Sequence, residues 1–150
     1  MPDDAPSFVH RRPVTIEWGD CDPAGIVFYP RYFAIFDAAT GALFQSALGM
    51  TKPGWTKRFG ILGIPMVDTR ARFHIPSTHG EELVIESRVT AFRRSSFDVE
   101  HRLLKADGAL GVEAFETRVW TSRDPEDPDR IRSIPIPPEV VAAFARRSVA

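Results

Sequence analysis

Two aspartates near the start of this 150-residue chain occupy a stretch where a carboxylate could do chemistry. Asp20 and Asp22 flank Cys21 in the sequence GDCDPAG, whose glycines and proline are typical of a tight turn. Aspartate is common in turns and at helix starts, so a structural role is the default interpretation for either residue. A catalytic role becomes more attractive if a second group in this region can act on the same substrate.

A predicted helix that begins a few residues after this loop supplies such a group. Residues 30–48 form its body, because Pro30 suits a first helical position and Gly49 suits the stop. The free amides of a helix N-terminus polarise a carbonyl or bind an anion. A nearby carboxylate could attack that carbonyl or activate a water while the amides hold the developing oxyanion, and the apolar residues 26–29 provide a wall.

The composition of this helix indicates that it is enclosed. Only Arg31 and Asp37 are ionisable, and large apolar residues are spread around all sides of the helical wheel. A helix of this kind must be surrounded, most simply by a curved sheet with a partner subunit over the rest. Asp37 is its only acid, and two interpretations stay open: an internal salt bridge or subunit contact, or the polar end of a substrate pocket.

The remaining nucleophile and ligand candidates are weaker. Cys21 lies between two acids, which disfavour the thiolate. His101 falls on the apolar face of a predicted strand and is expected to be a hydrogen-bonded core residue. The four histidines show no metal-ligand spacing; they are His10, His74, His79 and His101. The doublet Arg93 and Arg94, between two predicted strands, is either solvated surface or a phosphate-binding pair.

The second half of the chain predicts consecutive strands. Apolar and polar residues alternate most clearly over residues 66–75 and 96–104. The β-rich stretches, separated by turn residues, are 13–18, 66–75, 82–92, 96–104, 110–121 and 131–136, and a short helix is expected over 138–147. One strand, a long helix and then antiparallel strands predict a single α+β domain over residues 12–150, after a flexible arm over residues 1–11.

Charge and composition exclude several classes of function. Lys and Arg total 19 and Asp and Glu total 20, so the chain lacks the basic excess expected of a general nucleic-acid-binding protein. No apolar run reaches the length of a membrane span, and the N-terminal residues lack the apolar core of a signal peptide. A single cysteine excludes an internal disulfide and a cysteine-based zinc site, so we expect a reduced, cytoplasmic setting.

Residues 16–40, IEWGDCDPAGIVFYPRYFAIFDAAT, closely resemble the opening of the 4-hydroxybenzoyl-CoA thioesterase family, of the hot-dog-fold type with an active-site aspartate. The resemblance continues more weakly through residues 60–65, 92–97 and 130–138. It implies a long central helix wrapped by a curved antiparallel sheet. It also implies a homotetramer, built as a dimer of dimers with active sites at the dimer interface.

The resemblance assigns roles to individual residues. Asp22 matches the catalytic carboxylate, which acts as a nucleophile or as a general base for water, and Tyr29 matches the position whose backbone amide binds the thioester oxygen. Asp37 matches the aspartate that faces the ring hydroxyl of the benzoyl group. Arg93 and Arg94 match residues that contact the phosphates of coenzyme A, whereas Ser95 replaces the family's lysine, so the phosphate clamp is weaker or rebuilt elsewhere.

These matches predict a thioesterase for an aromatic acyl-CoA that needs no metal and no cofactor, coenzyme A being part of the substrate. The alternatives are a thioesterase for short or medium aliphatic acyl-CoA, and a non-catalytic acyl-binding module with the same fold. A hot-dog dehydratase would need a catalytic histidine near the helix, and none lies between His10 and His74.

Overall fold

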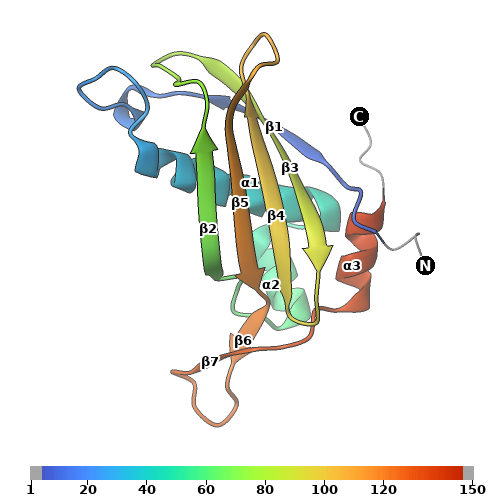
Figure 1. Ribbon diagram of the computed structural model, residues 1–150. Helices are drawn as coiled ribbons and strands as arrows, with labels where there is room; N and C mark the ends of the chain where they lie inside the picture. Colours follow the sequence, from blue (N-terminus) through green and yellow to red (C-terminus); the bar gives the residue numbers. More distant parts are fainter. Residues whose placement is uncertain (1–4, 147–150) are drawn as a thin grey trace.

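A computed structural model describes residues 5–146 and shows a long helix lying across one face of an antiparallel sheet (Figure 1). The sheet has five strands in the order β1-β3-β4-β5-β2, and two further strands form a separate pair. The elements are β1 (His10–Thr15), the 3-10 helix η2 (Trp18–Asp20), α1 (Tyr29–Leu48), α2 (Lys52–Phe59), β2 (Met66–Phe73), β3 (Glu82–Phe92), β4 (Ser96–Leu104), β5 (Leu110–Val119), β6 (Thr121–Arg123), β7 (Ile131–Ser133) and α3 (Pro138–Ala145). This arrangement confirms the predicted α+β class.

The predicted central helix is confirmed to within one residue. Pro30 lies in the first turn of α1, and Gly49 ends the helix with φ 68°, where its N–H donates to Gln45 O. The expectation that α1 is enclosed on all sides does not hold within one chain. Small and polar residues line a side that the chain leaves exposed, namely Ala34, Asp37, Ala38, Gln45 and Ser46.

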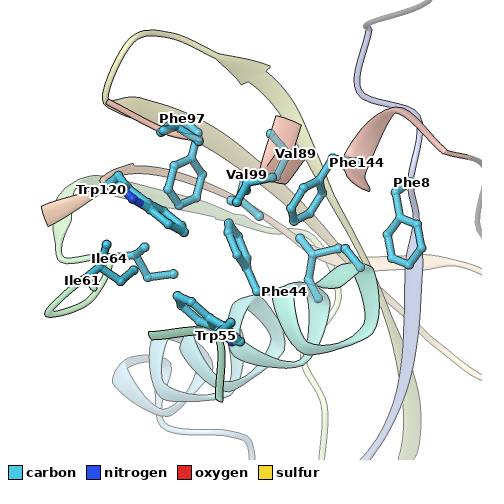
Figure 2. Close-up of a cluster of buried hydrophobic side chains, with 14 residues drawn as sticks. Phe8, Phe44, Trp55, Ile61, Ile64, Val89, Phe97, Val99, Trp120 and Phe144 are labelled. Carbon is cyan, nitrogen blue, oxygen red and sulfur yellow. The ribbon is translucent and has the colours of Figure 1, made fainter. Parts of the chain in front are cut away.

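An aromatic core surrounds the C-terminal half of α1 (Figure 2). The Phe44 ring lies 4.8 Å from Phe144, 5.1 Å from Phe97 and 5.5 Å from Trp55, measured between ring centroids. Trp55 comes from α2, which the sequence did not predict because Pro53 and Gly54 resemble turn residues. At the start of α2 the proline is tolerated, and the Thr51 side chain accepts a hydrogen bond from the Gly54 amide.

The N-terminal segment is more ordered than predicted. The amides of Ser7 and Phe8 donate to Phe144 O at 2.8 and 2.9 Å, and Phe8 is part of the core. Strand β1 begins at His10, because it pairs with β3 from His10 opposite Ser87 onward. The expectation of a flexible arm therefore does not hold for residues 7–11, and residues 1–4 lie outside the described part of the chain.

Strand β2 forms one edge of the sheet, paired with β5 on one side only. Its side chains are exposed apart from the half-buried Ala71, and Val67 and Phe73 are 63% and 51% exposed. Two large apolar side chains at a strand edge offer a surface that one chain does not cover. Within residues 5–146, no single helix is long and apolar enough to cross a membrane, and α1 and α2 meet both requirements only as a pair, across a 66° bend.

Candidate active site

The loop that precedes α1 folds back on itself, which brings its aspartates toward the helix start. Cys21 and Val27 form an isolated β-bridge, and the Phe28 amide donates to Asp20 O at 2.8 Å. Gly25 closes the turn with φ 82°, a conformation that favours glycine. The glycines and proline of GDCDPAG therefore build a tight hairpin, as their types suggest.

The two aspartates of this loop have different surroundings. Asp20 Oδ2 accepts the Glu17 amide at 2.9 Å and so caps the short helix η2, which is a structural role. Asp22 is half-buried, and its Oδ1 accepts the Ala24 amide at 2.8 Å. Asp22 Oδ2 accepts no hydrogen bond from any residue within 5–146, so this oxygen is available to a substrate or a water.

The first turn of α1 leaves one backbone donor free. Pro30 has no N–H, and the Arg31 amide donates to Phe28 O at 2.8 Å. In the described residues, the Tyr29 amide has no acceptor, and the Tyr29 side chain is exposed. A single N–H at the positive end of a 20-residue helix can therefore hold a carbonyl oxygen close to the Asp22 loop.

A second loop, residues 76–81, is hydrogen-bonded to the end of the Asp22 loop. The Val27 amide donates to Ser77 O at 2.9 Å, and Ile26 forms a β-bridge with Thr78. Lys105, in the turn after β4, contacts Pro76 O at 2.8 Å and Glu81 Oε1 at 2.7 Å. The hydrogen bond from Lys105 lowers the pKa of the Glu81 carboxyl, and the charged pair joins the turn after β4 to residues 76–81.

An apolar cavity of about 320 Å³ opens beside the helix start. Its lining includes Ile26, Tyr29, Tyr32 and Phe73, so it joins the Asp22 loop, α1 and the end of β2. A larger and more polar hollow of about 810 Å³ runs along the exposed side of α1, with His10, Arg12 and Lys52 in its lining and no acid. The smaller cavity is lined by Tyr29, at the helix start, and is the better place for an apolar group bound next to that residue.

Asp37 forms an ion pair, which is one of the two interpretations left open by the sequence. Its Oδ1 accepts Arg118 Nη2 at 2.8 Å, while its side chain is 66% exposed because it lies on the open side of α1. The same carboxylate can still meet a ligand, since Asp37 Oδ2 has no partner among residues 5–146.

A buried chain of polar side chains continues inward from this pair and was not predicted as a unit. The members, on α1, β3, β4 and β5, are Thr40, Ser87, His101, Glu116 and Arg118. His101 bonds Ser87 Oγ at 2.7 Å through Nδ1 and contacts Glu116 at 3.2 Å through Nε2, which confirms it as a satisfied core residue. Ser, His and Glu are the types found in hydrolytic triads. Here all three are buried, so no substrate reaches the hydroxyl.

Period-two alternation was the signal that could have revealed this chain. Along β5 the inward positions are Val112, Ala114, Glu116 and Arg118. Two charged residues on the apolar face of a predicted strand must be paired with each other or with a third charge. In the structure, Arg118 Nε donates to Glu116 Oε1 at 2.8 Å.

The predicted phosphate-binding residues lie far from the Asp22 loop of the same chain. The turn with Arg93, Arg94 and Ser95 follows the end of β3, whereas the start of β3 adjoins β1 and the loop before α1 (Figure 1). Eleven strand residues separate the two ends, or about 35 Å. Arg93 is already bound to Asp98 at 2.9 and 2.6 Å, while Arg94 is exposed and its side chain has no partner in the described residues.

Comparison with known proteins gives a consistent family. Residues 16–144 match the model of the thioesterase-like superfamily. The 4-hydroxybenzoyl-CoA thioesterase of Pseudomonas sp. (strain CBS-3) is 35% identical over 133 residues, covering 84% of this chain and 90% of that protein. A 1,4-dihydroxy-2-naphthoyl-CoA hydrolase of Synechococcus elongatus is 32% identical over 88 residues, covering 59% of this chain and 64% of that protein.

Solved structures agree with the sequence matches. The structure of the Pseudomonas 4-hydroxybenzoyl-CoA thioesterase superposes with a TM-score of 0.80 and 32% identity, covering 90% of this chain and 98% of that chain. The structure of a mutant of 4-hydroxybenzoyl-CoA thioesterase in complex with 4-hydroxybenzoyl-CoA superposes with a TM-score of 0.79 and 32% identity, covering 91% of this chain and 98% of that chain. The structure of the gentisyl-coenzyme A thioesterase BH1999 superposes with a TM-score of 0.75 and 28% identity, covering 87% of this chain and 98% of that chain.

Proposed function

The chain belongs to the thioesterase-like superfamily of thioester hydrolases and has their hot-dog fold, and from this premise we propose that it hydrolyses an aromatic acyl-CoA of the 4-hydroxybenzoyl-CoA kind to the free acid and coenzyme A. The observation that carries the proposal is that Asp22 Oδ2 and the Tyr29 amide, at the start of α1, both have no hydrogen-bond partner among residues 5–146. Both residues lie within the matched part of the chain.

In the proposed reaction, the thioester oxygen accepts a hydrogen bond from the Tyr29 amide, which stabilises negative charge as it develops on that oxygen. As a nucleophile, Asp22 bonds to the carbonyl carbon, the C–S bond breaks and coenzyme A leaves as a thiolate that takes up a proton. Water then hydrolyses the anhydride and regenerates Asp22. As a general base, Asp22 instead takes a proton from the attacking water. Neither route draws on a metal or a cofactor.

Two other regions bind the two ends of the substrate, which are the ring hydroxyl of the acyl group and the phosphates of coenzyme A. Asp37 accepts a hydrogen bond from the ring hydroxyl, which the free Oδ2 permits. Arg93, Arg94 and Ser95 bind the phosphates of coenzyme A, with Arg94 as the stronger contact because Arg93 is committed to Asp98. The distance along β3 means that this clamp serves the active site of another copy.

We accordingly propose a homotetramer that is a dimer of dimers, with active sites at the dimer interface. The exposed edge of β2, with Val67 and Phe73, supports a second copy at that edge. The exposed side of α1 supports further contact between copies. A cytoplasmic location remains the prediction from the single cysteine.

A thiol-release assay on the purified protein tests the function. The ester panel contains 4-hydroxybenzoyl-CoA, benzoyl-CoA, and short and medium aliphatic acyl-CoA. We expect the aromatic esters to be hydrolysed fastest; a preference for aliphatic esters would replace the proposed substrate, and binding without hydrolysis of any ester would indicate a non-catalytic module.

Asp22→Asn tests the catalytic assignment. The variant keeps the side-chain size but removes the charge, so turnover should fall by about 10²- to 10⁴-fold while acyl-CoA binding, measured by calorimetry, is retained. Asp20→Asn is the matched control, because Asp20 caps η2 and should leave most of the activity. Turnover by Asp22→Asn at the wild-type rate would remove Asp22 from the mechanism.

A further inference from the structure

The carboxylate of Asp37 is held on one side only. Arg118 Nη2 donates to its Oδ1 at 2.8 Å, and Oδ2 has no partner among residues 5–146. An exposed aspartate side chain on a helix normally samples several rotamers. A guanidinium fixed in the protein interior removes that freedom and points the second oxygen in one direction.

Arg118 itself is fixed by three groups. Besides the bond to Asp37, its Nε donates to Glu116 Oε1 at 2.8 Å and its Nη1 donates to Ile64 O at 3.1 Å. Its side chain is only 6% exposed, although Asp37 is 66% exposed. The guanidinium plane therefore spans from the core to the open side of α1, and its orientation is set from the buried end.

Glu116 in turn is held by α1 and β4. The Thr40 hydroxyl donates its hydrogen to Glu116 Oε1 at 2.6 Å. The Thr40 oxygen can therefore only accept from His101 Nε2, at 3.0 Å, so that nitrogen carries a hydrogen. Burial alone would raise the pKa of Glu116, but hydrogen bonds and charge from His101 and Arg118 lower it to about 2. Glu116 is thus an anion at neutral pH, and it anchors Arg118.

We propose that Arg118 is a positioning residue for substrate choice: anchored by Glu116, it fixes the Asp37 carboxylate so that the free oxygen accepts a hydrogen bond from a ring hydroxyl of the acyl group. This inference rests on the proposed function, because it concerns the acyl end of the same substrate. It predicts that the buried chain contributes to the preference for hydroxylated aromatic esters and not to cleavage of the thioester.

The test uses the double variant Glu116→Gln/Arg118→Met. Removing Arg118 alone would leave the buried Glu116 carboxylate without its arginine partner, which is destabilising, whereas the double change removes both charges. The matched control is Arg88→Met/Glu100→Gln, which removes a more exposed ion pair, with an N–O distance of 3.3 Å, from the neighbouring strands β3 and β4.

The readout is the ratio of kcat/KM for 4-hydroxybenzoyl-CoA to that for benzoyl-CoA, which lacks the hydroxyl. We expect the double variant to lower this ratio by about tenfold to a hundredfold, the range for a hydrogen bond to a charged group, while turnover of benzoyl-CoA changes little. In an Asp37→Ala background the same double change should leave the ratio unaltered. The control pair should retain the wild-type ratio.

Several results would overturn the inference. Equal losses on both esters would indicate a structural role alone, and an unchanged ratio, or a further fall in the Asp37→Ala background, would separate Arg118 from Asp37. A wild-type enzyme that hydrolyses both esters without preference would also overturn it and leave the proposed hydrolase activity standing. Failure of the wild type to hydrolyse any CoA ester would overturn the proposed function itself.

Discussion

The two halves of α1 are held in different ways. Around its C-terminal half, Leu43, Phe44 and Ala47 are fully buried in an apolar cluster that includes Trp55 and Trp120 (Figure 2). Around its N-terminal half, Tyr32, Phe36 and Ala39 lie in a second apolar cluster. Beside this cluster, Asp37 and Thr40 join the helix to Arg118 and Glu116 of the buried polar chain, while Tyr29 in the first turn is exposed. The difference shows how one helix can belong to the core and also present the candidate site at its start.

The division has a physical reason. Apolar packing is strong and non-directional, so it fixes the helix without demanding any particular polar partner. Once the helix is fixed by this packing, the Tyr29 amide can stay without an acceptor among residues 5–146 at little cost, because Tyr29 is exposed. Phe36 marks the boundary: it is buried, but its ring stacks on His101 at 5.1 Å, within the polar chain.

The largest expected effect comes from breaking the apolar half. Trp55→Ala deletes a fully buried ring beside Phe44 and Trp120, and should lower the free energy of unfolding by about 3–5 kcal/mol. Urea unfolding at equilibrium measures this loss. Because the candidate site lies at the other end of α1, kcat per folded molecule should stay near the wild-type value. A large fall in kcat would show that the apolar cluster around Trp55 and the candidate site are not independent.

A smaller effect is expected at the N-terminal end of α1, where the candidate site lies. Tyr29→Pro removes the free N–H but suits a first helical position, and Phe28 before it has φ −68° and ψ 118°, a conformation that precedes proline readily. We expect kcat to fall about 10²- to 10³-fold, as for the loss of one oxyanion donor, with little change in Tm.

Tyr29→Ala is the control for that prediction, because it keeps the amide and removes only the exposed ring. Steady-state kinetics on both variants should show a large loss for proline and a small one for alanine. Similar kcat values for the two would mean that the amide does not bind the thioester oxygen.

The smallest effect concerns Glu116, in the buried polar chain, and the pH dependence of the free energy of unfolding. The pKa of Glu116 falls from 4.5 to about 2 in the folded chain, so its contribution to stability is complete above about pH 4.5 and is lost as the pH falls through about 2. The amount is on the order of 3 kcal/mol. In Glu116→Gln this part of the acid dependence should disappear, whereas Glu100→Gln should retain it; unfolding by urea at pH 7, 4, 3 and 2.5 measures both.

Much of the fold could be predicted from the sequence because its signals are local. Pro30 and Gly49 mark the ends of α1, and alternation marks β4 over Ser96–Leu104. The helix α2 was missed because Pro53 and Gly54 normally indicate a turn, and here tertiary packing of Trp55 outweighs that preference. The first strand was placed too late because Pro13 was taken as its beginning, although β1 tolerates that proline at the sheet edge.

The candidate site was predicted only where its parts are close in sequence. Asp22 and Tyr29 lie in one loop and the helix turn that follows, so their proximity follows from chain length. Arg118 lies 81 residues from Asp37 in the sequence, and no local sequence pattern indicates that they form a pair. In the turn with Arg93 and Arg94, Asp98 binds the Arg93 side chain, and the doublet in the sequence does not indicate this difference between the two residues.

Pro30 has a stereochemical consequence. Among the described residues, Pro30 offers no N–H and the Arg31 amide is bound to Phe28 O, so a carbonyl bound as proposed would be fixed at the Tyr29 amide and could still rotate about the N–H···O axis. The plane of the acyl group would then be set by its lateral neighbours, such as the rings of Phe28 and Tyr29, which lie 5.7 Å apart and are inclined by 65°. In the proposed site, steric fit would therefore decide which face of the trigonal carbon turns toward Asp22, independently of how strongly the bond is polarised.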